Sequence, residues 1–171
     1  QKPILYVCNV SEMDLQRGNE NHYVQSVRSF LEKTGSGSYC MLSAKLESEL
    51  VDLSKEEAVE YLASLNLKDS GVNELIKRAY QLLGLASYFT AGVQEVHAWT
   101  FALGMKAPEC AGIIHTDFQR GFIKAEVVSY QDFVAQGGFV GAREKGKVRL
   151  EGKDYTFQEG DIALFKFNVT K

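Results

Sequence analysis

Residues 4–12 read ILYVCNVSE, an unbroken apolar run followed directly by polar side chains. Apolar runs of this length are typical of strands that are buried on both faces in a parallel sheet. Apolar residues then recur at helical spacing between Tyr23 and Leu31, Gly35 follows, and residues 39–42 (YCML) form a second apolar run. The pattern predicts a strand, a helix and a second strand, which together make the βαβ unit of an α/β fold.

The next helices are marked by their ends, and the character of the chain then changes. Ser54 and Glu57 form a capping box at the start of a helix that is predicted to end near residue 65, and a further helix covers residues 72–83. We place a domain boundary at 85/86, so that residues 1–85 form the α/β segment and residues 86–171 a small α+β domain. Strands are predicted in the second domain at 96–101, 122–128, 147–150, 155–157 and 162–167, with short helices at 108–118 and 130–136.

Composition bounds the function. The 171 residues are 45% hydrophobic, which suffices for a core, and 19 basic against 22 acidic residues give a net charge of −3. A chain this close to neutral has no strong field to attract nucleic acid. Its three cysteines lie far apart and suggest neither a disulfide framework nor a zinc site, which favours a reducing cytoplasm.

The start of the sequence shows no targeting signal. No apolar run approaches the roughly 20 residues of a membrane span, so no membrane partner is expected. The sequence starts without Met, a few residues before the first predicted strand, and we interpret this start as a cut end. The chain is therefore expected to be a fragment of a longer protein.

Two short polar motifs follow the two predicted strands of the first domain. The first motif contains Asn9, Val10 and Glu12. The second motif is SAK at residues 43–45, which begins with Ser43 and Ala44. Ligands of open α/β sheets bind beyond the carboxyl ends of the strands. Either motif alone is as well explained by an ordinary solvated loop, but both in order on adjacent strand ends indicate a nucleobase site.

One segment imitates a phosphate-binding loop. Residues 141–148 read GAREKGKV and match G-x-x-x-x-G-K, but the next position, which needs a Mg²⁺-binding hydroxyl, is Val148. The segment is also predicted to open a strand rather than a helix. We therefore reject this segment as a phosphate-binding loop, and no other segment of the sequence comes closer.

His115 and Asp117 resemble a metal or acid–base pair, but a structural histidine is the more common interpretation of two such residues.

A basic run overlaps that segment. Arg143, Lys145 and Lys147 lie within a few residues of one another and are candidates for contact with RNA or the ribosome. A solvated loop is the more common explanation of such a run.

Four stretches of the second domain resemble a known family. They are residues 95–100 (EVHAWT), 106–108 (KAP), 111–123 (AGIIHTDFQRGFI) and 151–155 (EGKDY). They resemble the TGS domain, a ubiquitin-like β-grasp module, of the YchF-type, Obg-related P-loop ATPases. Residues 2–12 (KPILYVCNVSE) are similar to the base-recognition segment of that family, which has N-x-x-E where GTPases have N-K-x-D. The resemblance therefore covers essentially the whole chain.

The resemblance implies a fold and a function. The fold would be the C-terminal βαβ part of a P-loop NTPase domain followed by a TGS domain. The ligand would be ATP, preferred over GTP, with Mg²⁺ whose ligands lie upstream of this chain. The partners would be the ribosome or ribosomal RNA, with regulatory proteins as further candidates, in the cytoplasm. No catalytic residue is expected here, so the chain alone should not hydrolyse ATP. The base site would comprise Asn9, Val10, Glu12, Ser43 and Ala44.

The N-x-x-E motif has a chemical rationale. The Asp of N-K-x-D accepts the N–H donors on the edge of guanine, whereas adenine presents a lone pair there. Glu12 moves the charge, and Val10 lacks the lysine stem that stacks on the base. A site that loses its polar complement loses discrimination, so ATP becomes plausible. Two alternatives stay open: a non-catalytic module that binds RNA or protein, and a GTPase relative with a TGS domain, against which residues 9–12 (NVSE) count.

Overall fold

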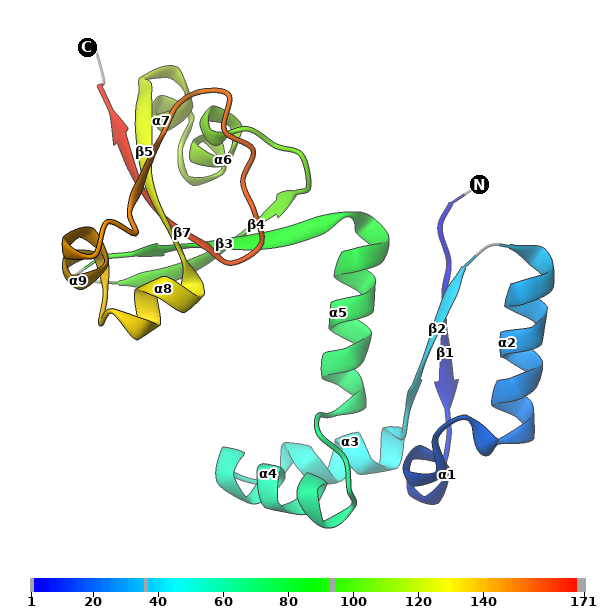
Figure 1. Cartoon of the computed structure of the whole chain (residues 1–171). Helices are drawn as coiled ribbons and strands as arrows, with labels where there is room; N and C mark the ends of the chain where they lie inside the picture. Colours follow the sequence, from blue (N-terminus) through cyan, green and yellow to red (C-terminus); the bar gives the residue numbers. More distant parts are fainter. Residues whose placement is uncertain (1, 36, 93–94, 169–171) are drawn as a thin grey trace. The chain divides into compact units, whose positions relative to one another are not determined.

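The computed structural model describes residues 2–35, 37–92 and 95–168. The chain divides into two compact units, Gln1–Leu83 and Gly84–Lys171, which are described separately (Figure 1). No described helix has the length and apolar character needed to cross a membrane.

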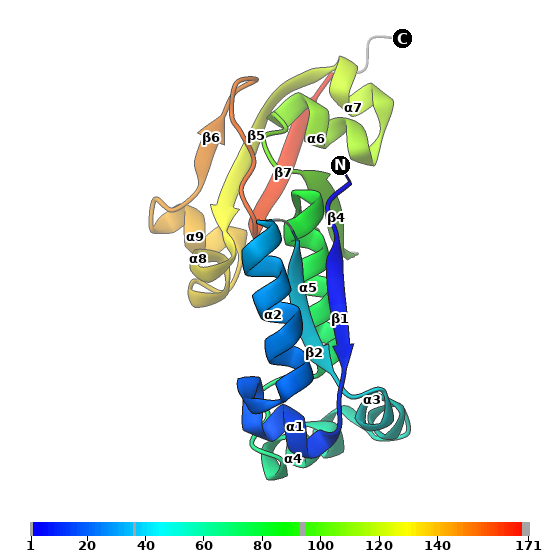
Figure 2. The same cartoon turned by 90° about the vertical axis from the view of Figure 1, so that its right-hand side faces the viewer.

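The first unit is built on a pair of parallel strands. β1 and β2 pair from Leu5 opposite Ser38 to Asn9 opposite Leu42. α2 and α5 lie on opposite faces of this pair (Figures 1 and 2). The elements are β1 (Leu5–Asn9), α1 (Glu12–Arg17), the 3₁₀ helix η1 (Gly18–Glu20), α2 (His22–Thr34), β2 (Ser38–Leu42), α3 (Ala44–Val51), α4 (Lys55–Ser64) and α5 (Gly71–Leu83).

The helices of this unit begin and end where the sequence supplies caps. The Asn21 side chain accepts hydrogen bonds from the first backbone N–H groups of α2, and Gly35 ends that helix in the left-handed conformation at φ 63°. The predicted capping box of Ser54 and Glu57 is confirmed at the start of α4. The predicted apolar face of α2 is partly wrong, because Val24 is buried whereas Tyr23 is 79% exposed.

The second unit is a five-stranded mixed sheet in the order β4-β3-β7-β5-β6. β3 and β7 are parallel neighbours, and every other pair is antiparallel. The elements are β3 (Leu85–Ala91), β4 (Val96–Ala102), α6 (Ala107–Ile114), α7 (Thr116–Arg120), β5 (Phe122–Ser129), α8 (Tyr130–Ala135), α9 (Phe139–Glu144), β6 (Arg149–Glu151) and β7 (Asp161–Phe167).

Aromatic rings form the main core of the second unit, between the sheet and α6. Tyr88 is fully buried and contacts Phe101 and Phe157 edge-on, with ring centroids 5.8 and 5.1 Å away. Its hydroxyl donates to the Cys110 carbonyl oxygen at 2.8 Å. Burial raises the pKa of the Cys110 thiol to about 12, so this cysteine stays a protonated, unreactive core residue.

Several sequence predictions for the second unit are wrong in detail. Strand β3 lies where no strand was expected, because its alternation is short and joins directly to α5. The expected helix at 108–118 is two helices, since His115 is extended at φ −161° and its ring caps α7 by accepting from the Asp117 N–H. Residues 155–157 form no strand, and Thr156 makes only an isolated bridge with Lys106.

The segment that imitates a phosphate loop also differs from its prediction. It does not simply open a strand: α9 covers its first residues and ends at Glu144, and β6 begins only at Arg149. The order is therefore helix, turn, strand. A phosphate-binding loop needs the reverse order, in which a buried strand leads through the loop into a helix whose N-terminus faces the phosphates.

Candidate functional site

The two predicted motifs lie side by side at the carboxyl ends of β1 and β2. Asn9 is the last residue of β1 and faces Leu42, the last residue of β2. The Val10 N–H extends this pairing by donating to the Leu42 carbonyl oxygen at 2.9 Å. The parallel register therefore places the Asn9 and Ser43 loops next to each other, as expected for neighbouring strand ends.

A hydrogen bond between a side chain and the backbone joins the two motifs. The Ala44 N–H donates to the Asn9 amide oxygen at 3.0 Å, across 35 positions of sequence. The Asn9 oxygen is thus engaged, and the Asn9 NH₂ group has no hydrogen bond to any residue that the structure describes. This NH₂ group is available to a ligand, whereas the Ala44 N–H is already bonded.

Glu12 forms a second link between the motifs. The Lys45 ammonium lies 3.0 Å from a Glu12 carboxylate oxygen and 3.6 Å from Glu49. The hydrogen bond to Glu12, and then the charge of Glu12, raise the pKa of Lys45. The Glu12 carboxylate is therefore held against a cation in the first turn of α3, an ion pair that the sequence did not reveal.

Ser43 has a structural role in addition to its place at the site. Its side chain is buried, and its hydroxyl oxygen accepts from the Leu46 N–H at 3.4 Å as the N-cap of α3. The cap fixes the direction of the backbone at Ala44. The sequence motif pointed to this residue but not to its capping role.

Glu47, one turn into α3, anchors the start of α5. Its carboxylate accepts from the Gly71 N–H at 2.7 Å. A Cβ at position 71 would lie 2.5 Å from the Leu42 Cβ, so only glycine allows α5 to approach the end of β2 this closely. This contact supports the strand end from which the candidate site starts.

A hollow of about 400 Å³ opens between the two loops. Four of the five predicted base residues line it, and Ala44 is the one that does not. Met13 and Lys45 line it as well; Met13 directly follows Glu12, and Lys45 is the third residue of the SAK motif. The lining is formed by Asn9, Val10, Ser11, Glu12, Met13, Ser43 and Lys45.

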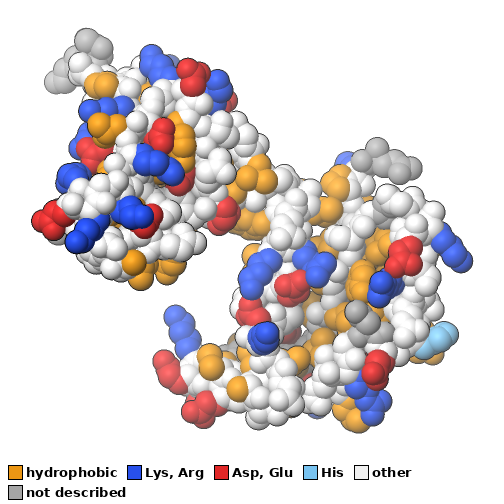
Figure 3. Space-filling model, viewed as in Figure 1, with side chains coloured by type: hydrophobic (Ala, Val, Ile, Leu, Met, Phe, Trp, Pro, Cys, Tyr) orange, Lys and Arg blue, Asp and Glu red, His pale blue; other side chains and the backbone are white. Residues whose placement is uncertain are grey.

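The basic run of the second unit is largely neutralised by its own fold. Arg143 pairs with Glu126, and Lys147 lies 3.3 Å from Asp132. The hydrogen bond from Arg143 lowers the pKa of Glu126. Lys145 is exposed and has no ion pair with any residue in the described ranges. Basic and acidic side chains are closely mixed on the face of this unit seen in Figure 3.

The histidines do not form a metal site. His115 serves as a helix cap, and the His97 ring lies 4.1 Å from the Trp99 ring, measured between centroids. Within residues 2–35, 37–92 and 95–168, no group of three or more His, Cys, Asp or Glu side chains is arranged to hold a metal ion.

Comparisons with known proteins connect this geometry with one family. The family model YchF-GTPase_C, described as "Protein of unknown function (DUF933)", matches residues 85–168. "Ribosome-binding ATPase YchF" of Bacillus subtilis (strain 168) is 54% identical over 168 residues, which are 98% of this chain and 46% of that protein. "Obg-like ATPase 1" of Gallus gallus is 42% identical over 169 residues, which are 98% and 42%.

Solved structures agree with the sequence relatives. "Structure of the Schizosaccharomyces pombe YchF GTPase" superposes with a TM-score of 0.84 at 36% identity and covers 96% of this chain and 43% of that one. A GTP binding protein from Pyrococcus horikoshii OT3 has a TM-score of 0.64 at 20% identity, which shows the fold alone. The chain spans a little under half the length of the curated relatives it matches.

Proposed function

Because the chain belongs to the YchF family, we propose that it carries the base-recognition half of an ATP site and a docking domain of a ribosome-associated, cytoplasmic ATPase linked to translation or stress. The observation that carries this proposal is the hydrogen bond from the Ala44 N–H to the Asn9 amide oxygen. It binds two loops, distant in sequence, into one preorganised site at the strand ends.

The free group of Asn9 suits a purine. Adenine and guanine both present N7 as an acceptor, and an asparagine NH₂ group is a donor of matching reach. Asn9 would therefore select a purine without distinguishing adenine from guanine. Discrimination between adenine and guanine would therefore depend on positions 10 and 12. Val10 has no long side chain that could stack on the base, and the Glu12 carboxylate is paired with Lys45. These features favour ATP over GTP.

The second unit supports the assignment of a TGS domain. Its first and last strands, β3 and β7, are parallel neighbours, and α6 packs against one face of the sheet. This arrangement supports a ubiquitin-like β-grasp module, which the family resemblance implies. Its proposed function is docking, to the ribosome first and to regulatory proteins as further candidates.

Hydrolysis requires groups that this chain does not supply. Phosphoryl transfer depends on a cradle for the phosphates and on Mg²⁺. The sequence has no phosphate-binding loop, and the described residues contain no carboxylate cluster that fits a metal ion. We therefore assign to this chain the recognition of the base.

The proposed role of Asn9 is tested by a matched pair of variants. Asn9→Asp keeps an oxygen for the Ala44 N–H but loses the NH₂ donor, whereas Asn9→Ala loses both. Adenosine, which carries no phosphate charge, is the probe, and its binding is followed by NMR at the backbone amides of residues 9–12 and 43–45. We expect about fivefold weaker binding in both variants, because one ligand hydrogen bond contributes about 1 kcal/mol.

The stability of the same two variants distinguishes a role of Asn9 in ligand binding from a role in holding the two loops together. Asn9→Asp should unfold at nearly the same denaturant concentration as the parent chain, whereas Asn9→Ala should be destabilised. If Asn9→Asp binds adenosine as well as the parent chain does, Asn9 only joins the loops and the base-reading role is wrong.

The alternative function is a non-catalytic docking module, which the separate core of the second unit favours. If the basic run docks on ribosomal RNA, Lys145 should contribute most, because Arg143 and Lys147 are already paired. Neutralising all three to Gln should weaken co-sedimentation with ribosomes, and Lys145→Gln alone should lower the salt dependence by about one phosphate contact. Lys68→Gln, an exposed change in the other unit, is the control. Unchanged pelleting of the triple variant would mean that the run is a solvated surface.

A further inference from the structure

The sheet of the second unit has a seam between β3 and β7. β7 pairs with β5 from Asp161, opposite Ser129, to Phe167, opposite Phe122. It pairs with β3 only where Phe89 faces Ile162, and the two strands diverge beyond that point. After Ile162, one edge of β7 therefore has no partner strand among the described residues, and an edge without a partner can accept a new strand.

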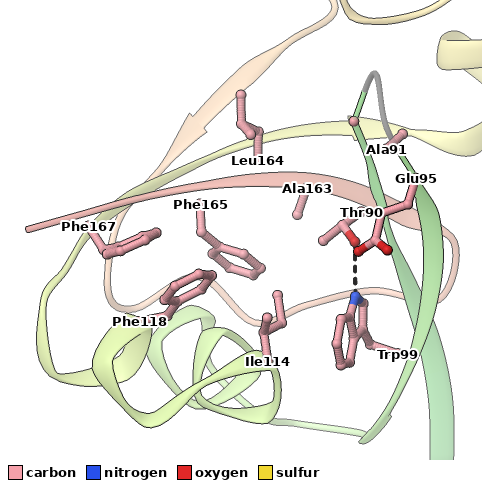
Figure 4. A pocket seen from close by; sticks show the side chains of 11 residues that line it. Thr90, Ala91, Glu95, Trp99, Ile114, Phe118, Ala163, Leu164, Phe165 and Phe167 are labelled. Atoms are coloured by element: carbon pink, nitrogen blue, oxygen red, sulfur yellow. Dashed lines mark hydrogen bonds between the residues drawn. The ribbon is translucent and has the colours of Figure 1, made fainter.

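A hollow of about 640 Å³ lies where the strands diverge. This size lies within the roughly 300–1,000 Å³ range of small-ligand sites. Its walls are mainly Trp99, Ile114, Phe118, Phe165 and Phe167, which point toward one another in Figure 4. The Phe118 and Phe167 rings stack with their centroids 3.8 Å apart, so one wall is a preformed aromatic surface.

The lining also contains consecutive residues of β7. Ala163, Leu164 and Phe165 are consecutive and all line the hollow, although side chains alternate along a strand. Figure 4 shows the Leu164 side chain turned away from the aromatic walls. Leu164 therefore lines the hollow with its main chain, and the open edge of β7 and the apolar hollow form one continuous surface.

One acidic side chain, Glu95, lies on this surface. Glu95 is the only charged residue that lines the hollow, and it makes no ion pair with a residue of the described ranges. Figure 4 shows its carboxylate beside Thr90. The Trp99 N–H donates to the Thr90 hydroxyl at 2.9 Å, so the indole is already satisfied and presents only its apolar surface. The hollow thus combines apolar walls with one unpaired negative charge.

We propose that this seam binds an extended peptide, which adds as a strand along the open edge of β7. One apolar or aromatic side chain of the peptide fills the hollow, and a lysine or arginine two residues away, on the same face, pairs with Glu95. The open backbone favours a peptide over a small molecule because main-chain hydrogen bonds carry the affinity in strand addition, while pockets for alternate side chains carry the specificity. The inference lies wholly within the second unit and does not depend on the proposed ATP site.

The single tryptophan of the chain makes the test direct, since Trp99 lines the hollow. The probe is the peptide acetyl-Ser-Phe-Thr-Lys-Ser-amide, titrated into the full chain while Trp99 fluorescence is recorded. We expect a saturable change. The same peptide N-methylated on its central residues, which cannot pair with a strand edge, should bind at least about tenfold more weakly, since it loses two or more main-chain hydrogen bonds. Equal binding of the two peptides would overturn strand addition, and so would no change with either.

A charge exchange tests the orientation. Glu95→Lys should weaken the lysine peptide about fivefold, as expected for one partly exposed ion pair, and should strengthen a peptide with Glu in place of Lys. Glu144→Lys, at an exposed position on α9, makes the same change of net charge away from the seam and should leave both affinities unaltered. If both variants behave alike, Glu95 is not part of the site. If tyramine changes Trp99 fluorescence with the same affinity as the peptide, or if peptide-free chains self-associate through this face, the peptide assignment is wrong.

Discussion

Replacing Tyr88 by alanine is expected to lower the free energy of unfolding of the second unit by about 4 kcal/mol, the usual cost of removing a large buried aromatic ring. Tyr88 is fully buried and contacts Phe101, Phe157 and Phe165 edge-on. Phe157, itself buried, also contacts Phe101 edge-on, so these rings brace one another. The cavity left by alanine would face rigid rings that cannot relax into it.

Tyr88→Phe is the matched control. It keeps the ring and removes only the hydrogen bond to the Cys110 carbonyl oxygen, so a loss of about 1 kcal/mol is expected. Burial raises the pKa of Tyr88 far above its usual range, so the hydroxyl remains a donor at any pH used for unfolding. Denaturant unfolding followed by Trp99 fluorescence measures both variants, because the only tryptophan lies in this unit. Similar losses for both variants would show that the ring is not central to the core.

The second large effect concerns the choice of purine. The double change Val10→Lys and Glu12→Asp should raise the affinity for guanosine relative to adenosine by roughly 30- to 150-fold, because a hydrogen bond to a charged group contributes about 2–3 kcal/mol. The shorter Asp cannot hold Lys45 as Glu12 does, so its carboxylate becomes free to accept the guanine N–H donors. The lysine at position 10 adds a stem that can stack on the base.

Two single variants locate the effect. Glu12→Gln breaks the ion pair with Lys45 without supplying a guanine acceptor of full charge, and Val10→Lys supplies the stem alone. Neither single variant should reproduce the change of preference from adenosine to guanosine. Both nucleosides are titrated against the chain with NMR detection. An unchanged ratio in the double variant would remove positions 10 and 12 from base recognition.

Short stretches of sequence were sufficient to predict some of the helices and strands. The apolar run at residues 4–8 predicted the strand β1, although no residue of β1 is buried as such a run had suggested. The Ser54 capping box predicted the start of α4, because helix capping depends on residues within a few positions. The break of the expected helix at His115 was missed, since an imidazole cap is a rare substitute for a hydroxyl or carboxylate. Strand β3 was missed because its alternation is short and it follows α5 directly, although its main partner, β4, is the next strand in the sequence.

The sequence by itself determined the two motifs at the strand ends, the lack of a phosphate-binding loop and the family resemblance, because each depends on residue type and order. Only the tertiary structure decided how those residues are used. It showed that the Asn9 oxygen is bonded to Ala44 and that Glu12 is held by Lys45. It also showed that Arg143 and Lys147 of the basic run are paired with carboxylates of their own unit. It also revealed the seam between β3 and β7. These are contacts between side chains and strands far apart in the chain, and their partners are chosen by the packing of the whole unit rather than by any local pattern.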